Sequence, residues 1–307
     1  MNHGIVIKTT GSWHTVKDGD KIIPCKIRGR FREKELTITN PVAVGDRVSY
    51  ETDRDGAGLI IHIEPRKNYI IRRSSNLSKE AHILAANLDQ AFLMITLAMP
   101  ETPLEFADRF LLAAEAYHIP VILLINKTDL LSGESLSFLH SVTETYRSAA
   151  YACMEISVKT GKGMEAVVDS MKDKTSLLAG NSGVGKSTLI NRICPEAKLK
   201  TLEISASHKT GKHATTYAEM ITLPNGGNII DTPGIRGFGI IELAKNEIGL
   251  YFTDIFRVSQ DCSFYNCTHI HEPGCAVIKA VEDGILAPSR YQSYVNIFLD
   301  RNEKYRM

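Results

Sequence analysis

Two short segments of this 307-residue chain have the residue types and spacing needed to bind a nucleotide. Residues 180–187 have the pattern G-x-x-x-x-G-K-S, which predicts a P-loop, a glycine-rich turn whose backbone N–H groups surround phosphates at a helix N-terminus. Lys186 should reach the β- and γ-phosphate oxygens, and the Ser187 hydroxyl should bind Mg²⁺. We expect every residue of the turn and the first helical turn to contact the nucleotide, namely Gly180, Asn181, Ser182, Gly183, Val184, Gly185, Lys186, Ser187 and Thr188.

The second segment, residues 126–129, has the form N-K-x-D, which distinguishes guanine from adenine in GTP-binding proteins. The Asp129 carboxylate can accept hydrogen bonds from guanine N1–H and the 2-amino group, and adenine offers neither donor. The Lys127 stem can lie over the base, and Asn126 can tie this loop to the P-loop. Ser157 and Lys159 are similar to an S-A-K element that supports guanine, and we expect both to contact it.

Residues between the P-loop and position 235 supply the candidates for Mg²⁺ and the γ-phosphate. Residues 231–234 have the form D-x-x-G, so Asp231 should hold Mg²⁺ through water and the Gly234 N–H should contact the γ-phosphate. A switch threonine is also required, and residues 211–216 end in two threonines. We prefer Thr216 to Thr215, and the sequence leaves that choice open.

The residue that activates water is the least defined part of the site. Ras-type enzymes place a glutamine directly after D-x-x-G, and this chain has Ile235, which cannot orient water. Hydrolysis is then either slow without a partner or assisted by another group. His213 is the candidate catalytic residue, because a neutral imidazole can accept a hydrogen bond from water. The alternatives are that His213 only faces solvent or that a partner completes the site.

Three of the six cysteines crowd near the C-terminus with metal-binding spacing. Cys262, Cys267, His269 and Cys275 offer three thiolates and one imidazole, a closed set typical of one structural zinc ion per chain. His271 is an alternative fourth ligand. We expect the other cysteines, at positions 25, 153 and 194, to be small buried residues in a reducing, cytoplasmic protein.

The remaining sequence predicts how these segments are positioned. Residues 1–66 contain short strands and turns, which favour an OB-fold barrel over an SH3-like barrel. Residues 67–238 alternate strand and helix, which predicts a parallel sheet with helices on both faces; residues 66–82 are polar and should link the two parts. Residues 239–307 are mainly helical around the cysteine cluster. Because the base reader precedes the P-loop, the nucleotide-binding part must be circularly permuted, and its loops can still meet at the carboxyl ends of the strands.

Composition and charge restrict the partners. Hydrophobic content of 43% and a net charge of +1 are ordinary for a soluble globular protein, and no apolar stretch is long enough to cross a membrane. Residues 1–73 hold 14 Lys and Arg against 9 Asp and Glu, which favours a polyanionic partner. Lys26, Arg28, Arg30 and Arg32 could contact RNA phosphates, or could form a solvated or protein-binding face. Nothing in the sequence suggests more than a monomer.

Together, the permuted order, the P-loop, residues 231–236 and the Cys/His spacing resemble the ribosome small-subunit-dependent GTPase A family (RsgA, also called YjeQ) over nearly the whole chain. The resemblance implies an OB-fold, a GTPase domain and a C-terminal zinc domain. It also implies late maturation of the 30S subunit and GTPase activity stimulated by that particle. The family uses a switch histidine for water activation, which corresponds to His213. This chain has Lys212 and Ala214 where the family usually has Arg and Thr.

Two other functions are compatible with the same motifs. A nucleotide-gated module that binds RNA or ribosomes with negligible hydrolysis is favoured by Ile235 in the place of the glutamine. A P-loop kinase or ATPase is disfavoured by Asp129, because adenine would leave that carboxylate unpaired.

Overall fold

The computed structural model describes residues 1–27, 41–53, 56–73, 81–199, 218–231 and 243–299. Its first five strands close into a barrel, in which β1 pairs antiparallel with β2 and β4, and β5 pairs parallel with β3 and antiparallel with β4. A closed five-stranded barrel of this kind confirms the expected OB-type architecture. The strands are β1 (Asn2–Thr10), β2 (Trp13–Asp18), β3 (Lys21–Ile27), β4 (Arg47–Thr52) and β5 (Gly58–Ile63).

The barrel encloses an apolar interior. Alternate residues of its strands point inward, so that Val6, Val16, Val48 and Ile60 have no exposed surface. Cys25 lies among them and is also fully buried, as the sequence predicted for this cysteine. Cys153 and Cys194 are only partly buried, so that prediction was wrong in degree for them.

A mostly parallel sheet forms the centre of the molecule. Five of its strands run in the order β10-β9-β8-β11-β13 and are all parallel, so their carboxyl ends share one edge. The strands are β8 (Gln90–Thr96), β9 (Val121–Asn126), β10 (Ala152–Glu155), β11 (Thr175–Ala179) and β13 (Asn228–Asp231). The next strand, β12 (Glu219–Thr222), was not predicted and runs antiparallel to β13, because only a tight turn over residues 223–227 joins the two.

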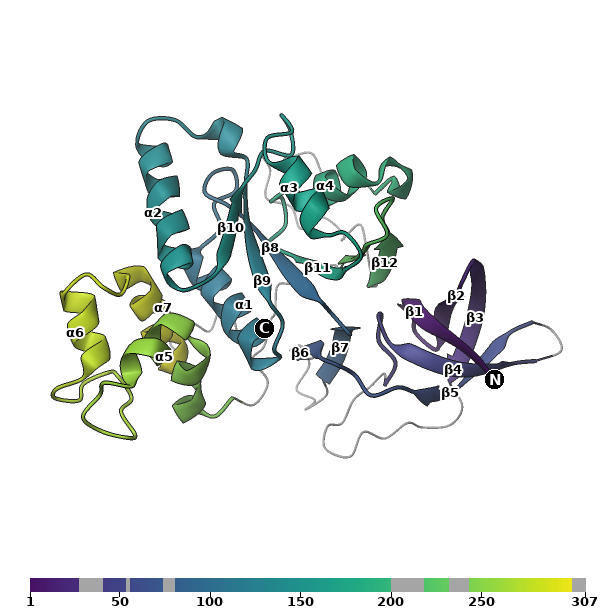
Figure 1. The fold of residues 1–307 in the computed structure, drawn as a ribbon, viewed down its shortest axis with the longest axis horizontal. Coiled ribbons are helices and arrows are strands. Elements are labelled where there is room, and N and C mark those ends of the chain that lie inside the picture. Colours follow the sequence, from purple (N-terminus) through teal and green to yellow (C-terminus); the bar gives the residue numbers. More distant parts are fainter. Residues whose placement is uncertain (28–40, 54–55, 74–80, 200–217, 232–242, 300–307) are drawn as a thin grey trace.

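Helices cover both faces of this sheet (Figure 1). Side chains of β8 alternate between the two faces: Leu93 and Ile95 pack in the core with α1 (Leu104–Ala116) and α2 (Glu134–Ser148). Phe92 and Met94 pack in the core with α3 (Met164–Ser170) and α4 (Lys186–Ile193). The predicted layers are therefore present. Single 3-10 turns follow β9 and α4, as η1 (Thr128–Leu130) and η2 (Pro195–Ala197).

The barrel and the central sheet are joined edge to edge. Strand β1 pairs antiparallel with β12 at Lys8 and Glu219, and the Lys8 ammonium lies 3.1 Å from each oxygen of the Glu219 carboxylate. Lys17 Nζ donates to Thr222 Oγ1 at 3.1 Å. The described residues therefore contain one continuous sheet of 11 strands that runs from the barrel into the nucleotide-binding part.

A two-stranded sheet overlaps the segment, residues 66–82, that we expected to be a polar link. Strands β6 (Tyr69–Arg73) and β7 (Ala81–Ala86) pair antiparallel as a hairpin. Ile70 is fully buried against Ala85, which gives the hairpin a core side. The arginine- and serine-rich composition of residues 72–80 hid this short apolar pattern.

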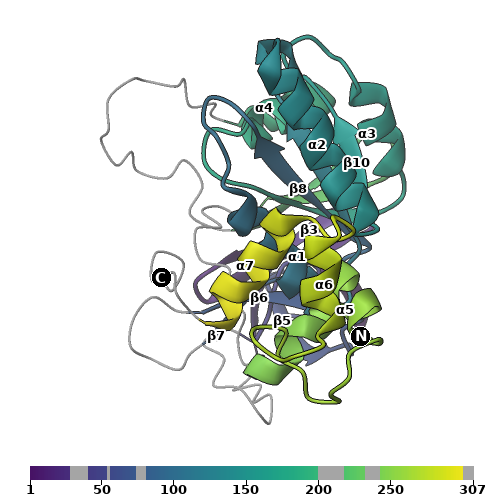
Figure 2. The ribbon, with the colours of Figure 1, turned by 90° about the vertical axis from the view of Figure 1, so that its left-hand side faces the viewer.

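The C-terminal part is helical, as predicted, and packs against α1 (Figure 2). It consists of η3 (Lys245–Tyr251), α5 (Thr253–Ser259), α6 (Ala276–Glu282) and α7 (Pro288–Phe298), and its core includes Leu112 of α1. The barrel and these helices lie at opposite ends of the molecule (Figure 1). In the described part of the chain, no helix combines the length and apolar character required to span a bilayer.

Candidate nucleotide site and metal centre

The motif-bearing loops meet at the carboxyl edge of the parallel strands, as the permuted order required. Asn126 ends β9 and residues 127–129 follow it, Ser157 follows β10, the P-loop follows β11, and Asp231 ends β13. Open α/β sheets bind ligands at this edge. The fold therefore brings together the base-reading and phosphate-binding candidates that lie in the described residues.

The P-loop lysine lies across its own turn. Lys186 begins α4, and its ammonium donates to the carbonyl oxygens of Gly180 at 2.7 Å and Asn181 at 2.9 Å. Burial lowers the pKa of Lys186, and the nearby Asp231 carboxylate opposes that shift. A half-buried cation beside a helix N-terminus favours an anionic ligand.

Asn126 connects the predicted base reader, residues 126–129, both to the P-loop and to the turn at residues 157–161, which we call the base-supporting turn. Its amide nitrogen donates to Val184 O at 2.8 Å, and its amide oxygen accepts from Val158 N–H at 3.0 Å. Gly185 makes this approach possible, because it has φ +109 and an added Cβ would lie 2.6 Å from Asn126 Nδ2. The predicted role of Asn126 therefore has a direct geometric counterpart.

The carboxylate of Asp129, which the sequence predicts to read guanine, is oriented by a buried serine. Ser157 Oγ donates to Asp129 Oδ1 at 2.6 Å and accepts from Thr160 N–H at 3.1 Å. Asp129 itself is exposed, which leaves the carboxylate accessible to a ligand. Lys127 Nζ reaches over to the P-loop and donates to Gly183 O at 2.8 Å. Lys159 is exposed on the turn after Ser157.

One contributor to this edge was missed in the sequence. Lys127 Nζ also donates to the carbonyl of Met99, in the loop after β8, and Pro100 lies against Gly183. The available signal was positional: the loop after a central parallel strand must emerge at the same edge as the P-loop.

Asp231 has the character of a cation ligand. It is 7% exposed, and burial raises the pKa of its carboxyl even though Lys186 opposes the shift. A divalent cation would restore the charged form. Ser187 lies in the first turn of α4. The donor set thus fits Mg²⁺ as far as it is described.

The other candidates at the active site and on the basic face lie outside the described residues, namely His213, Thr215, Thr216, Gly234, Ile235, Arg28, Arg30 and Arg32.

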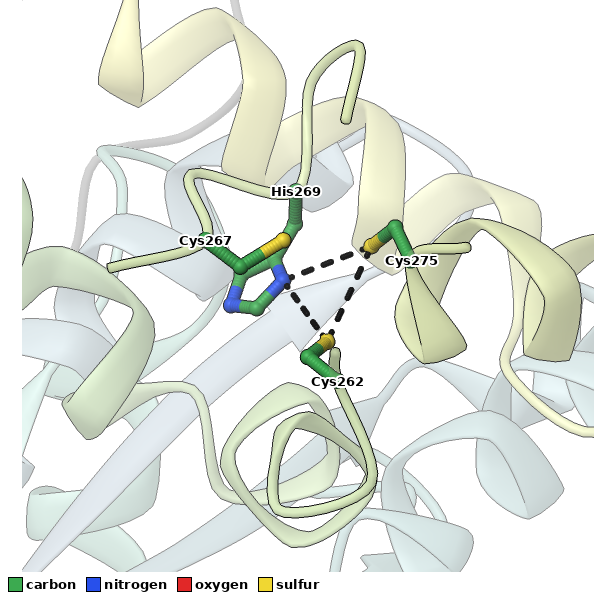
Figure 3. A group of neighbouring side chains, drawn as sticks. All are labelled: Cys262, Cys267, His269 and Cys275. Atoms are coloured by element: carbon green, nitrogen blue, oxygen red, sulfur yellow. Dashed lines mark hydrogen bonds between the residues drawn. The ribbon is translucent and has the colours of Figure 1, made fainter. Parts of the chain in front are cut away.

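The Cys/His cluster forms a second, separate site (Figure 3). The ligand atoms of Cys262, Cys267, His269 and Cys275 all lie within 4.8 Å of one another. His269 Nδ1 is 3.6 Å from Cys262 Sγ and 3.5 Å from Cys275 Sγ, and these two sulfurs are 3.9 Å apart. Tetrahedral zinc would space sulfur and nitrogen ligands about 3.5–3.8 Å apart. The set therefore fits a closed tetrahedral metal site.

Two side chains, those of Glu272 and Tyr291, fix the loop that carries His269. The Glu272 carboxylate accepts from Thr268 N–H at 2.8 Å, Ile270 N–H at 3.1 Å and His271 N–H at 3.2 Å. The Tyr291 hydroxyl donates to His269 O at 2.8 Å. His271, the alternative ligand, is exposed and does not belong to the cluster, so the geometry favours His269.

Comparisons with known proteins agree with this architecture. A family model described as RsgA GTPase matches residues 63–241, and a model described as RsgA N-terminal domain matches residues 3–60. The small ribosomal subunit biogenesis GTPase RsgA of Bacteroides fragilis is 52% identical over 305 residues, which cover 99% of this chain and 98% of the relative. RsgA 2 of Bacteroides thetaiotaomicron is 53% identical with the same coverage.

Solved structures give the same assignment. YjeQ from Thermotoga maritima matches with a TM-score of 0.78 and 35% identity, covering 97% of this chain and 98% of that chain. YloQ, described as a circularly permuted GTPase, matches with a TM-score of 0.74 and 32% identity, covering 99% and 97%. With both family models matched and half of its residues identical to those of full-length relatives, this chain belongs to the RsgA family of circularly permuted GTPases.

Proposed function

We propose that this chain hydrolyses GTP during late maturation of the small ribosomal subunit, and that the particle stimulates its activity. Relatives that match it over nearly their whole length are named small ribosomal subunit biogenesis GTPases. The observation that carries the proposal is the bond of 2.8 Å between Lys127 Nζ and Gly183 O, which joins the base reader to the phosphate-binding loop.

The proposal assigns each nucleotide-binding residue a role. Asp129 reads guanine, Ser157 orients Asp129, and Lys127 and Lys159 flank the base. The P-loop, residues 180–187, and Thr188 surround the phosphates, with Lys186 on the β and γ oxygens. Asn126 holds these loops together through its contact with Val184. Gly234 contacts the γ-phosphate.

Ser187, Asp231 and Thr216 would hold Mg²⁺, which supplies charge stabilisation at the phosphates. His213 accepts a proton or a hydrogen bond from the attacking water. Because Ile235 cannot do this, the unstimulated rate should be low, and docking on the particle should raise it.

The C-terminal cluster binds one structural zinc ion per chain, through Cys262, Cys267, His269 and Cys275. All four positions of a tetrahedral ion are then occupied by protein, which leaves no open position for catalysis. The metal would fix the loop that precedes α6, whose N-cap residue is Cys275.

We further propose three units, a barrel over residues 1–66, a GTPase domain over residues 67–238 and a zinc domain over residues 239–307. The chain acts as a cytoplasmic monomer that contacts ribosomal RNA through its basic barrel. Lys26 supports this role, since its ammonium lies 4.5 Å from the centroid of the exposed Trp13 ring and leaves a cation and an aromatic side chain together on the surface.

Steady-state hydrolysis of GTP and ATP, with and without purified small subunits, tests the proposal. We expect GTP to be preferred and small subunits to accelerate turnover, with His213→Ala losing most of the stimulated rate. Asp129→Asn should weaken GTP and favour xanthosine triphosphate. Equal hydrolysis of ATP and GTP would contradict the base assignment. Binding to small subunits without stimulated turnover would favour the nucleotide-gated module instead.

A further inference from the structure

The helix that starts at the P-loop also reaches the base-supporting turn. Helix α4 begins at Lys186, and Arg192 lies in its last turn. The Arg192 guanidinium donates from Nη1 to Val158 O at 2.6 Å and to Lys159 O at 3.2 Å. One short helix therefore begins at the proposed phosphate site and holds residues 157–161 at its end.

The turn is shaped to receive this guanidinium. Gly161 has φ +94, and an added Cβ would lie 2.6 Å from Arg192 Nη2, so a side chain there would displace the arginine. The turn is closed by Gly161 N–H on Ser157 O at 2.8 Å. Thr160 N–H donates to Ser157 Oγ, which donates to Asp129. A continuous set of hydrogen bonds thus runs from Arg192 to the guanine-reading carboxylate.

The Val158 carbonyl that Arg192 holds also fixes the direction of a backbone donor, the N–H of Lys159. In a trans peptide the C=O and the following N–H lie in one plane and point in opposite directions. Holding Val158 O therefore aims the N–H of Lys159 away from Arg192. Backbone N–H groups of this element are the ones that we expect to support the base, whose 6-oxo group is an acceptor in guanine and is replaced by an amino donor in adenine.

We propose that Arg192 is a positioning residue for guanine recognition, acting through the backbone of the turn at residues 157–161. It does not touch the nucleotide; it sets the orientation of the Lys159 N–H and supports the Ser157–Asp129 pair. The inference rests on the proposed function, because it presumes that GTP occupies this site.

Competition binding tests this role with two ligands, guanine nucleotides and inorganic triphosphate, each with Mg²⁺. Triphosphate occupies the P-loop and cannot reach the turn. Arg192→Ala should weaken GTP and GDP by a similar factor of about three to ten, as expected for the loss of partly exposed hydrogen bonds from a charged donor. Affinity for triphosphate should stay unchanged. Arg192→Lys keeps the charge but lacks the planar guanidinium, whose Nη1 group donates to both carbonyls, and should show most of the same loss.

Arg257 provides a matched control, because it is also an exposed arginine on a helix and donates to a backbone carbonyl, that of Ser148, at 3.2 Å. Arg257→Ala should leave both affinities unchanged. An equal loss of GTP and triphosphate binding in Arg192→Ala would show that Arg192 only stabilises α4, and unchanged GTP binding would overturn the role altogether. If the unmodified chain failed to prefer GTP over ATP, the proposed function would fail instead, whatever the variants did.

Discussion

The amide nitrogen of Asn126 lies 2.8 Å from the carbonyl oxygen of Val184, which follows it 58 residues later in the chain. The base reader thus comes before the P-loop in sequence and contacts it directly in space. Circular permutation changed the order of the strands along the chain and left their carboxyl ends at one edge of the sheet. The chemistry depends on that edge and is insensitive to where the chain begins.

Replacing Asn126 tests how far the site depends on this contact. Asn126→Ala would remove both of its hydrogen bonds and leave Val184 O and Val158 N–H without those partners. An unsatisfied buried group costs about 1–3 kcal/mol, so we expect GTP affinity to fall by at least about fivefold, as measured by titration calorimetry. GTP and GDP should be affected alike, because the contact lies between loops and does not involve the γ-phosphate.

Asn225 is the matched control for this variant. Its amide nitrogen donates to Val168 O at 2.8 Å, so it makes the same kind of bond outside the motif-bearing loops. Asn225→Ala should lower stability slightly and leave GTP affinity within about twofold of the unmodified chain. If the two variants bound GTP equally well, Asn126 would not hold the site together.

If the Cys/His cluster binds zinc as proposed, the zinc content of the chain depends on the four side chains of that cluster. The purified chain should contain one zinc ion, and Cys275→Ser or His269→Ala should lose it, because a closed site cannot replace a missing ligand. His271→Ala should retain it. Metal analysis by mass spectrometry measures the content, and a chelator should lower the melting temperature of the C-terminal helices, since binding stabilises the folded state.

Cys194→Ser serves as the control, since Cys194 is a partly buried cysteine outside the cluster. It should keep full zinc content. Retention of zinc by His269→Ala combined with loss in His271→Ala would reverse the ligand assignment.

A buried arginine joins the C-terminal helices to the nucleotide-binding part. Arg290 of α7 is 1% exposed and donates to Asp108 of α1 at 2.6 Å and to Asp254 of α5 at 2.9 Å. Arg290→Met should destabilise the chain by about 3–5 kcal/mol, because two buried carboxylates lose their counter-ion. Combining it with Asp108→Asn and Asp254→Asn should recover part of the loss. Urea unfolding followed by circular dichroism gives the values.

Arg147 and Glu144 form a comparable ion pair at the surface of α2, with about half of each side chain exposed. Arg147→Ala should cost no more than about 0.5 kcal/mol. If Arg290→Met were equally mild, the ion pairs would not be what fastens α7 to α1.

The sequence was informative where chemistry restricts residue type within one short segment. The P-loop, the contact of Asn126 with that loop and the Cys/His set need particular side chains at particular spacings, so the sequence pattern predicted them. Strand β12 is only four residues long, and its pairing with β1 joins segments that are distant in sequence, so no local pattern records that contact. Arg192 was missed for the same reason, because its partners at 158 and 159 are backbone carbonyls and leave no signature in residue type.

The barrel should lose stability in mild acid because of one histidine. His14 on β2 is 1% exposed, and in the described part of the chain neither ring nitrogen has a hydrogen-bond partner. Burial lowers the pKa of His14 below its usual 6.5, and the Asp46 carboxylate opposes the shift. At a pH between the lowered pKa of the folded barrel and the usual pKa of 6.5, the histidine of the unfolded chain binds a proton that the folded barrel does not bind. The stability that neutral His14 contributes to the folded barrel is therefore fully present above about pH 6.5, and it is lost as the pH falls through the lowered pKa.

Trp13 makes this measurable, because it is the only tryptophan in the chain and lies beside His14 on the same strand. Its fluorescence reports unfolding of the barrel separately from the other parts. The urea midpoint should fall between about pH 7.5 and pH 5.5, and His14→Leu should show a smaller fall, since leucine cannot bind the proton. If the urea midpoint fell equally in the unmodified chain and in His14→Leu, other groups would cause the acid sensitivity, because removing the imidazole would then have made no difference.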